Sequence, residues 1–334
     1  MKNKKTKAIL TSNQMIIVYI MIVLSVLIGT KNSAFFDFST VITLCRVALV
    51  TLIFALAEML VIVSGGIDVS FPAIACLTLY LPVFLETKIW KIDNVVLIFV
   101  LAVVFGLAIG AFNAWMISIM GIPPLIATLG TSSIINGALM ATTSGKEISN
   151  LPASMDALYS SYFFTYTAPS GMTYSLSVLF IVPVIFIILT ALLLRKTMLG
   201  RGIFAIGGDR NAAKVAGFNV RKIQFFVYMA VGAMTGIAGV CSCILARTAH
   251  PTNLMGSEMM VIAAVVVGGT RITGGHGTVI GTVLGVFLIA LIENNLIMMG
   301  VPTYWQSFVV GLVIVLGTSI TSLRAKKIAQ SAKV

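Results

Sequence analysis

Long apolar runs recur along the whole chain, and they limit its fold more than any other feature. Most of these runs are long enough, at about 20 residues, to cross the hydrocarbon core of a bilayer as a helix. Only 10% of the 334 residues are charged and 59% are hydrophobic, which excludes an ordinary soluble domain. Because lipid offers the backbone no hydrogen-bond partners, such runs must form helices. The sequence therefore predicts an all-α polytopic membrane protein that acts in transport or signalling across the membrane.

The basic residues indicate how the chain is threaded through the membrane. Lysine and arginine crowd into the N-terminus, the loop 196–222 and the C-terminus, and such clusters are typical of cytoplasmic segments. Six spans before this loop and four after it place all three segments on the same side. The ten expected spans are 13–30, 40–64, 71–86, 94–119, 122–143, 173–195, 224–246, 257–270, 277–299 and 303–323.

One membrane domain with two short tails accounts for the whole length. We expect a cytoplasmic N-terminal tail over 1–12, a transmembrane domain over 13–323 and a cytoplasmic C-terminal tail over 324–334. The N-terminal run resembles a signal peptide, but no small-residue cleavage site follows it, which favours an uncleaved first helix. The run 257–270 is short, so it is either a full span or a re-entrant helix.

The net charge of +12 follows from this topology, and we expect no nucleic-acid partner. The four cysteines lie in apolar segments without the spacing of a metal site: Cys45, Cys76, Cys241 and Cys243. We therefore expect no metal, no cofactor and no catalytic residue. The sequence contains no G-x-x-x-x-G-K-[ST] pattern, so this chain has no phosphate-binding loop of its own.

Two segments far apart in the sequence resemble each other. The segment 63–70 reads VSGGIDVS and the segment 266–273 reads VVGGTRIT. Internal repeats of this kind are common in transporters, where the solute path lies between the two halves. A chance match of eight residues rich in glycine and valine is the alternative. We interpret the chain as two pseudo-repeated halves.

The first repeat segment breaks the rules for a passive membrane helix. Gly65 and Gly66 loosen the helix, and the polar residues Asp68 and Ser70 follow just before Phe71. Polar groups at this depth need partners in protein or in a water-lined cavity. These five residues are candidates for the solute pathway. The alternative is structural, with Asp68 or Ser70 capping the next helix.

Other polar residues inside the expected spans are also candidates for the pathway. They are Glu58, Asn113 and Asn294, and each needs a hydrogen-bond or charge partner. Glu58 could pair with Arg46 only if folding brings the two together, because twelve helical residues span about 18 Å. A scaffold role is the alternative reading of Asn113.

The loop 196–222 contains a candidate docking element. The residues from Asp209 to Val215 have the composition of a short amphipathic helix that Asp209 would cap and Gly217 would end. Such a helix, lying against lipid headgroups, would have the same composition. The docking candidates are Asp209, Arg210, Asn211, Ala212, Ala213, Lys214 and Gly217.

Four motifs occur here in the order seen in one transporter family. The segments GGIDVS, IPPLIATLGT, GGDRNAAKVAGFNV and VVVGGTRITGGHGTVIGT, spread over roughly residues 40–320, resemble those of ribose-type ABC importer permeases. The resemblance implies a channel of two permeases, this chain with a second copy or a paralogue. It also implies cytoplasmic ATPase subunits, docked at 209–217, and an extracytoplasmic solute-binding protein that delivers a sugar.

Several positions depart from the family pattern. Glu58 stands where an apolar residue is usual, and Phe71 and Pro72 replace smaller residues near the presumed path. Asn211 stands where glutamate is common, and His276 where a basic residue is common. These departures bear on the solute, so a nucleoside or a signalling furanose is an alternative to a monosaccharide. An ion-coupled secondary transporter, which needs no ATPase, is the alternative mechanism.

Overall fold

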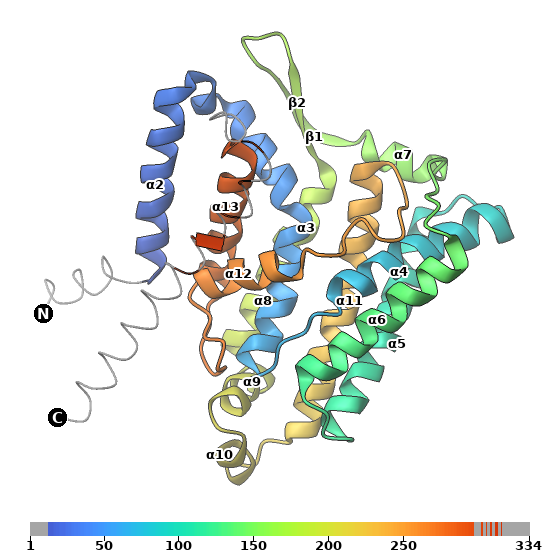
Figure 1. Ribbon diagram of the computed structural model, residues 1–334, viewed down its shortest axis with the longest axis vertical. Helices are drawn as coiled ribbons and strands as arrows, with labels where there is room; N and C mark the ends of the chain where they lie inside the picture. The colour runs from blue at the N-terminus through green and yellow to red at the C-terminus, as the bar shows by residue number, and fades with distance from the viewer. Residues whose placement is uncertain are drawn as a thin grey trace, which may run out of the picture.

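The computed structural model describes residues 13–296 and the single positions 302, 305, 308, 311, 312 and 315. The expected tails 1–12 and 324–334, and nearly all of the expected span 303–323, lie outside the described residues. Within the described part the fold is mostly helical (Figure 1), and seven helices are long and apolar enough to cross a membrane. The predicted all-α polytopic architecture is confirmed, whereas the cytoplasmic placement of the termini stays a prediction.

The helices follow one another along the chain with connections of different lengths. They are α2 (Asn13–Lys31), α3 (Phe38–Val63), α4 (Phe71–Phe84), α5 (Val95–Ser118), α6 (Pro124–Thr143), α7 (Ala153–Tyr159), α8 (Ile181–Lys196), α9 (Met198–Gly208), α10 (Arg210–Val215), α11 (Val220–Ala246), α12 (Glu258–Val267) and α13 (Val279–Leu296). Short 3-10 turns form at Ser33–Phe36 and Val178–Phe180, and a π-helical turn, Leu85–Trp90, extends α4.

The span expected at 173–195 is wrong at its start. Residues Thr173–Ser177 form a strand, β2, which pairs antiparallel with β1, Tyr162–Thr167. Small polar and larger side chains alternate along β2, a period of two that is typical of a strand. Gly171, whose φ is +81°, lies in the connecting turn. The helix of this span begins only at α8, and the hairpin projects from one end of the molecule (Figure 1).

The short run near 257–270 forms a correspondingly short helix. Helix α12 has ten residues, Glu258–Val267, and α13 follows it after a glycine-rich loop. Ten helical residues are about 15 Å long, half of what the hydrocarbon core requires. The helix alone cannot cross a bilayer, which favours the re-entrant interpretation of this segment.

Helix α11 lies at the centre of the packing, against α3, α4 and α5 (Figure 1). Its contact with α5 depends on small residues. A Cβ atom added at Gly106 of α5 would overlap the carbonyl group of Gly232 on α11, and the converse also holds. Small residues at these positions let two membrane helices approach backbone to backbone. The close contact fixes α5, which carries Asn113, relative to the core.

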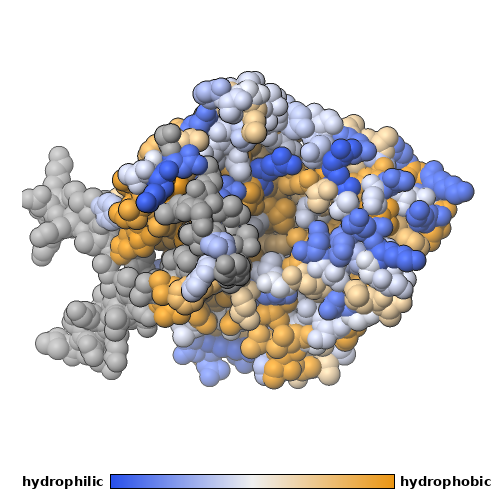
Figure 2. All heavy atoms as spheres, turned by 45° about the horizontal axis from the view of Figure 1, so that its top comes forward, coloured by the Kyte–Doolittle hydropathy of each residue, from blue (hydrophilic) through white to orange (hydrophobic). Residues whose placement is uncertain are grey.

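The outer surface of the described helices is largely apolar. Exposed aliphatic side chains lie along α2, α5, α6 and α8, and Figure 2 shows broad hydrophobic areas between the polar ones. An apolar surface of this extent is expected where lipid replaces water as the solvent.

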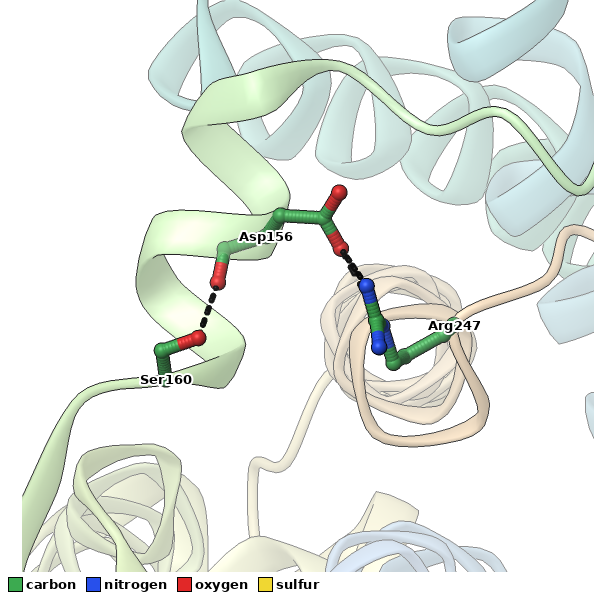
Figure 3. Close-up of polar contacts among 3 residues, drawn as sticks. All are labelled: Asp156, Ser160 and Arg247. Carbon is green, nitrogen blue, oxygen red and sulfur yellow. Dashed lines mark hydrogen bonds and ion pairs between the residues drawn. The ribbon is translucent and has the colours of Figure 1, made fainter.

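One ion pair joins α7 to the end of α11 beside the hairpin. Arg247 Nη2 lies 3.2 Å from Asp156 Oδ1 (Figure 3), and the guanidinium also lies over the ring of Tyr159. Both charged side chains are about half exposed, so the pair contributes only about 0–1 kcal/mol to stability.

Candidate functional site

The chain is broken between α3 and α4, where the sequence predicts a loosened helix. Helix α3 ends at Val63 and α4 begins at Phe71. Gly65 has a φ of +88°, a left-handed backbone that other residues adopt at a cost. A Cβ added at Gly66 would lie 2.7 Å from the hydroxyl of Tyr228 on α11. The two glycines therefore let the chain turn sharply against the central helix.

A buried chain of hydrogen bonds runs from this break into α5 and α6. Asp68 Oδ1 accepts from the backbone N–H of Ser70 at 2.7 Å and from its Oγ at 2.6 Å. Ser70 Oγ accepts in turn from Asn113 Nδ2 at 2.9 Å, and Asn113 Oδ1 accepts from Thr131 Oγ1 at 2.6 Å. None of these four side chains is more than 3% exposed. We call these four residues the polar network.

The capping role considered for Asp68 and Ser70 is wrong in its detail. Ser70 occupies the N-cap position of α4, but its side chain makes no capping hydrogen bond. Its hydroxyl hydrogen is directed to Asp68, which forms a local turn with Ser70 itself. Pro72 does stand in the first turn of α4, where its missing N–H costs nothing.

Glu58 faces the same break from α3 and is fully buried. Its Oε1 accepts from the backbone N–H of Asp68 at 3.2 Å, whereas Oε2 is buried without a hydrogen-bond partner among the described residues. Arg46 lies exposed on the same helix, so the possible pairing of these two residues does not form. Glu58 supports the break by receiving a backbone donor that would otherwise be unsatisfied.

The geometry at Glu58 predicts that its oxygen matters more than its charge. Glu58→Gln keeps an acceptor for the Asp68 N–H and should leave the thermal midpoint of the purified protein nearly unchanged. Glu58→Leu leaves that buried donor unsatisfied, at a cost of about 1–3 kcal/mol. Thermal unfolding in detergent measures both variants. Equal losses of stability in the two would show that the negative charge itself is needed.

Two other predicted pathway residues take no part in the polar network. Phe71 is fully buried and packs its ring 5.1 Å from that of Phe54, so it belongs to the core. Asn294 is half-buried near the end of α13. Leu291, three residues earlier, packs with Ile28 and Phe35 at the connection between α2 and α3. The structure therefore brings together Glu58, Gly65, Gly66, Asp68, Ser70 and Asn113, and not Asn294.

The sequence interpretation did not include the partners that α6 and α11 supply. Thr128 Oγ1 accepts from the N–H of Val69 at 3.2 Å, and Thr131 completes the polar network. These threonines are three residues apart and share a helix face, which is the signal that could have identified them. Tyr228, beside Gly66, lies in an apolar run that carries no comparable signal.

The second candidate element, at the opposite end of the molecule from the hairpin, is α10 (Figure 1). Both predicted ends of this helix are confirmed. Asp209 Oδ1 accepts from the N–H groups of Asn211 at 2.8 Å and Ala212 at 3.0 Å. These backbone hydrogen bonds lower the pKa of the Asp209 carboxyl. Gly217, with a φ of +87°, ends the helix in the left-handed region.

One of the docking candidates does not lie on the exposed face of α10. Ala213 is 3% exposed and packs inward, whereas Val215 is 90% exposed. Arg210 is tied to α11 by a hydrogen bond of 2.7 Å from its Nη2 to Gln224 Oε1. The exposed face of α10 therefore includes Asn211, Ala212, Lys214 and Val215 together with the exposed part of Arg210.

The described residues contain no group of three or more His, Cys, Asp or Glu side chains that could hold a metal ion. The cysteines within them are free thiols. The chemistry that this arrangement supports is hydrogen bonding inside the membrane domain.

Comparisons with known proteins cover both elements. A family model described as branched-chain amino acid transport system / permease component matches residues 40–317. A ribose import permease protein of Escherichia coli is 30% identical over 316 residues, 94% of this chain and 95% of the relative. An autoinducer 2 import system permease protein of Yersinia enterocolitica is 30% identical over 290 residues, 86% of this chain and 76% of the relative. No solved structure matches the chain.

Proposed function

This chain belongs to the branched-chain amino acid transport system / permease component family, and from that membership we propose that it is the membrane-spanning subunit of an ATP-driven importer. One observation carries the proposal: a relative named as a ribose import permease aligns over 94% of this chain and 95% of its own length. Alignment over almost the whole of both chains includes the break, the polar network and α10. The chain is accordingly a multi-pass protein of the cell membrane.

The proposed solute is a monosaccharide or a similar small polar molecule. The relative from Escherichia coli is named for ribose, which favours a pentose-sized sugar. The relative from Yersinia enterocolitica is named for autoinducer 2, and this makes a signalling molecule the second candidate. The family description names branched-chain amino acids, so membership alone defines a permease and not its solute.

The expected mechanism is alternating access around the break between α3 and α4. The members of the polar network are buried and hydrogen-bonded to one another, so they hold the broken segment in place in this conformation. Discontinuous helices of this kind border the solute path in many transporters. We therefore propose that the network positions the segment beside the path, and that a solute reaches Asp68 or Ser70 only after the network opens.

The importer requires other chains. ATP hydrolysis is assigned to a separate cytoplasmic ATPase that docks on α10, since this sequence has no phosphate-binding loop. A second permease, identical or paralogous, would complete the channel. An extracytoplasmic solute-binding protein would deliver the solute on the side of the hairpin and α7.

Capture of the permease from its native membrane tests this function. Mild solubilisation should yield a stoichiometric ATPase together with the chain, and the reconstituted complex should import ribose only when ATP is supplied. Competition by autoinducer 2 in the same assay decides between the two solutes. A preparation without ATPase that still transports in gradient-energised vesicles would instead establish an ion-coupled secondary transporter.

A further inference from the structure

Three glycine-containing segments, far apart in the sequence, meet beside the break. They are the end of α3 with Gly65, the end of α9 with Gly207, and the loop between α12 and α13 with Gly274 and Gly275. The second repeat segment, 266–273, ends just before this loop. We call these four glycines the glycine junction.

The contact at Gly207 is between backbones only. A Cβ added there would overlap the carbonyl oxygen of Val63 and lie 2.7 Å from the nitrogen of Gly275. These neighbours are main-chain atoms, which cannot rotate away as the end of a side chain can. Gly207 is therefore inserted between the other two segments with no space for any side chain.

The remaining glycines close the junction from the other side. A Cβ at Gly274 would lie 2.7 Å from the oxygen of Gly207 and 2.9 Å from the Cα of Gly65. The N–H of Gly275 donates to the carbonyl oxygen of Val63 at 2.9 Å, which joins the two loops directly. Gly65, Gly274 and Gly275 all have a left-handed φ, so the shape of each turn is also particular to glycine.

The junction lies between the two elements of the proposed function. Gly207 is two residues before Asp209, the N-cap of α10, and Gly65 is three residues before Asp68 of the polar network. A displacement of α10 would therefore be transmitted to the break through a single set of main-chain contacts. Side-chain contacts could absorb such a displacement by changing rotamers, whereas main-chain contacts cannot.

We propose that the glycine junction is the rigid link through which α10 moves the break between α3 and α4. Gly207 is then a positioning residue, which contacts neither solute nor ATPase. The inference rests on the proposed function, because it assumes an ATPase that acts on α10. A second connection from this region, the Arg210–Gln224 hydrogen bond, runs to α11 through side chains, which can change rotamer, and not through main-chain contacts.

Two adjacent glycines of α9 provide a matched test. Gly207→Ala introduces the overlap with Val63, whereas a Cβ at Gly208 meets nothing within 4 Å. Both changes replace a glycine at the C-terminal end of α9 by alanine, so the change in helix propensity is similar in the two variants. Gly207→Ala should keep the ATPase attached and lower import about tenfold or more, the range of a typical coupling between sites. Gly208→Ala should retain both the ATPase and import.

The outcomes separate this inference from the function on which it rests. A wild-type chain that captures no ATPase contradicts the proposed function itself. Normal import by Gly207→Ala overturns the link, as does loss of the ATPase from that variant alone. An equal loss of import in Gly208→Ala overturns it too, since the defect would then not depend on the junction.

A measurement on the unmodified complex keeps the inference testable if Gly207→Ala fails to fold. The Gly275 amide should stay protected from hydrogen exchange in both the nucleotide-free and the nucleotide-bound complex, because a rigid link stays closed throughout the cycle. Rapid exchange of this amide in either state would show that the junction opens, and would overturn the proposal.

Discussion

Replacing Val215 by aspartate is expected to remove the ATPase from the purified permease and to abolish import. Val215 is an apolar side chain at the end of α10 and is 90% exposed. An exposed apolar side chain of this kind is typical of a protein-interaction surface. In the complex with the ATPase, an aspartate at this position would be buried with its negative charge unpaired. Loss of a contact that contributes strongly to binding costs about 2 kcal/mol or more, a factor of about 30 in affinity.

The fold itself should survive this change. Val215 makes no core contact, and aspartate near a helix C-terminus costs only about 0.3–1 kcal/mol. Co-purification, measured by the ratio of ATPase to permease, therefore reports docking directly. Thermal unfolding of the permease alone provides the check that the membrane domain is intact.

A matched change at the far end of the molecule controls for the added charge. Met172 is 65% exposed in the turn of the hairpin, opposite α10 (Figure 1). Met172→Asp should leave the ATPase attached. If Val215→Asp still captures a full complement of ATPase and imports normally, α10 is not the docking element.

Helix α10 shows what local sequence determines and what it does not. Its two ends follow from Asp209 and Gly217, because a cap and a left-handed stop act within a few residues. Which face is buried depends on the neighbouring elements, and a six-residue helix is too short for a periodic pattern to reveal it. The inward position of Ala213, one of the docking candidates, was not predictable for this reason.

The membrane spans were predictable to a similar extent. Within the described residues, most of the long apolar runs coincide with helices to within a few residues because lipid requires every backbone group to be paired within the helix. The start of the span at 173 was misplaced because hydropathy does not distinguish the residues of β2 from the apolar helix that follows. It also cannot detect that β2 pairs with β1. That pairing is a contact between segments, and only the fold reveals it.

The candidate site was predictable residue by residue but not as a network. Asp68, Ser70 and Asn113 were identified because each is polar inside an apolar region. Their mutual hydrogen bonds, and the role of Thr131, depend on how α5 and α6 pack beside the break. Glu58 was identified in the same way, but its role as acceptor for the backbone N–H of Asp68 depends on how α3 packs beside the break.

Changes at Asn113 should have the largest effect on the stability of the membrane domain. Its amide donates to Ser70 Oγ and accepts from Thr131 Oγ1, so both of its polar atoms are used. Asn113→Leu removes both bonds from a fully buried position, at about 1–3 kcal/mol for each group left unsatisfied. Thr131 can still donate to the carbonyl oxygen of Ala127 at 3.1 Å, which limits the cost on that side.

Asn113→Asp should be worse than Asn113→Leu, although aspartate is the closer match in shape. The new carboxylate oxygen would face Ser70 Oγ, whose hydrogen already points to Asp68. Two oxygen acceptors would then face each other with no hydrogen between them, close to the carboxyl group of Asp68. An uncompensated buried charge costs about 3–5 kcal/mol. The thermal midpoint in detergent should therefore be highest for the wild type, lower for Asn113→Leu and lowest for Asn113→Asp. Asn150→Asp, a control on an exposed loop, should change the midpoint little.

A double-variant cycle then tests whether these residues act as one unit. Thr131→Val alone leaves the Asn113 oxygen without its donor, whereas in the Asn113→Leu background the same change removes a hydroxyl that has already lost this bond. The second substitution should thus cost less in the variant than in the wild type, by about 0.5–3 kcal/mol. Strict additivity would mean that Asn113 and Thr131 contribute independently, and the polar network would then not be the element that holds the break against α5 and α6.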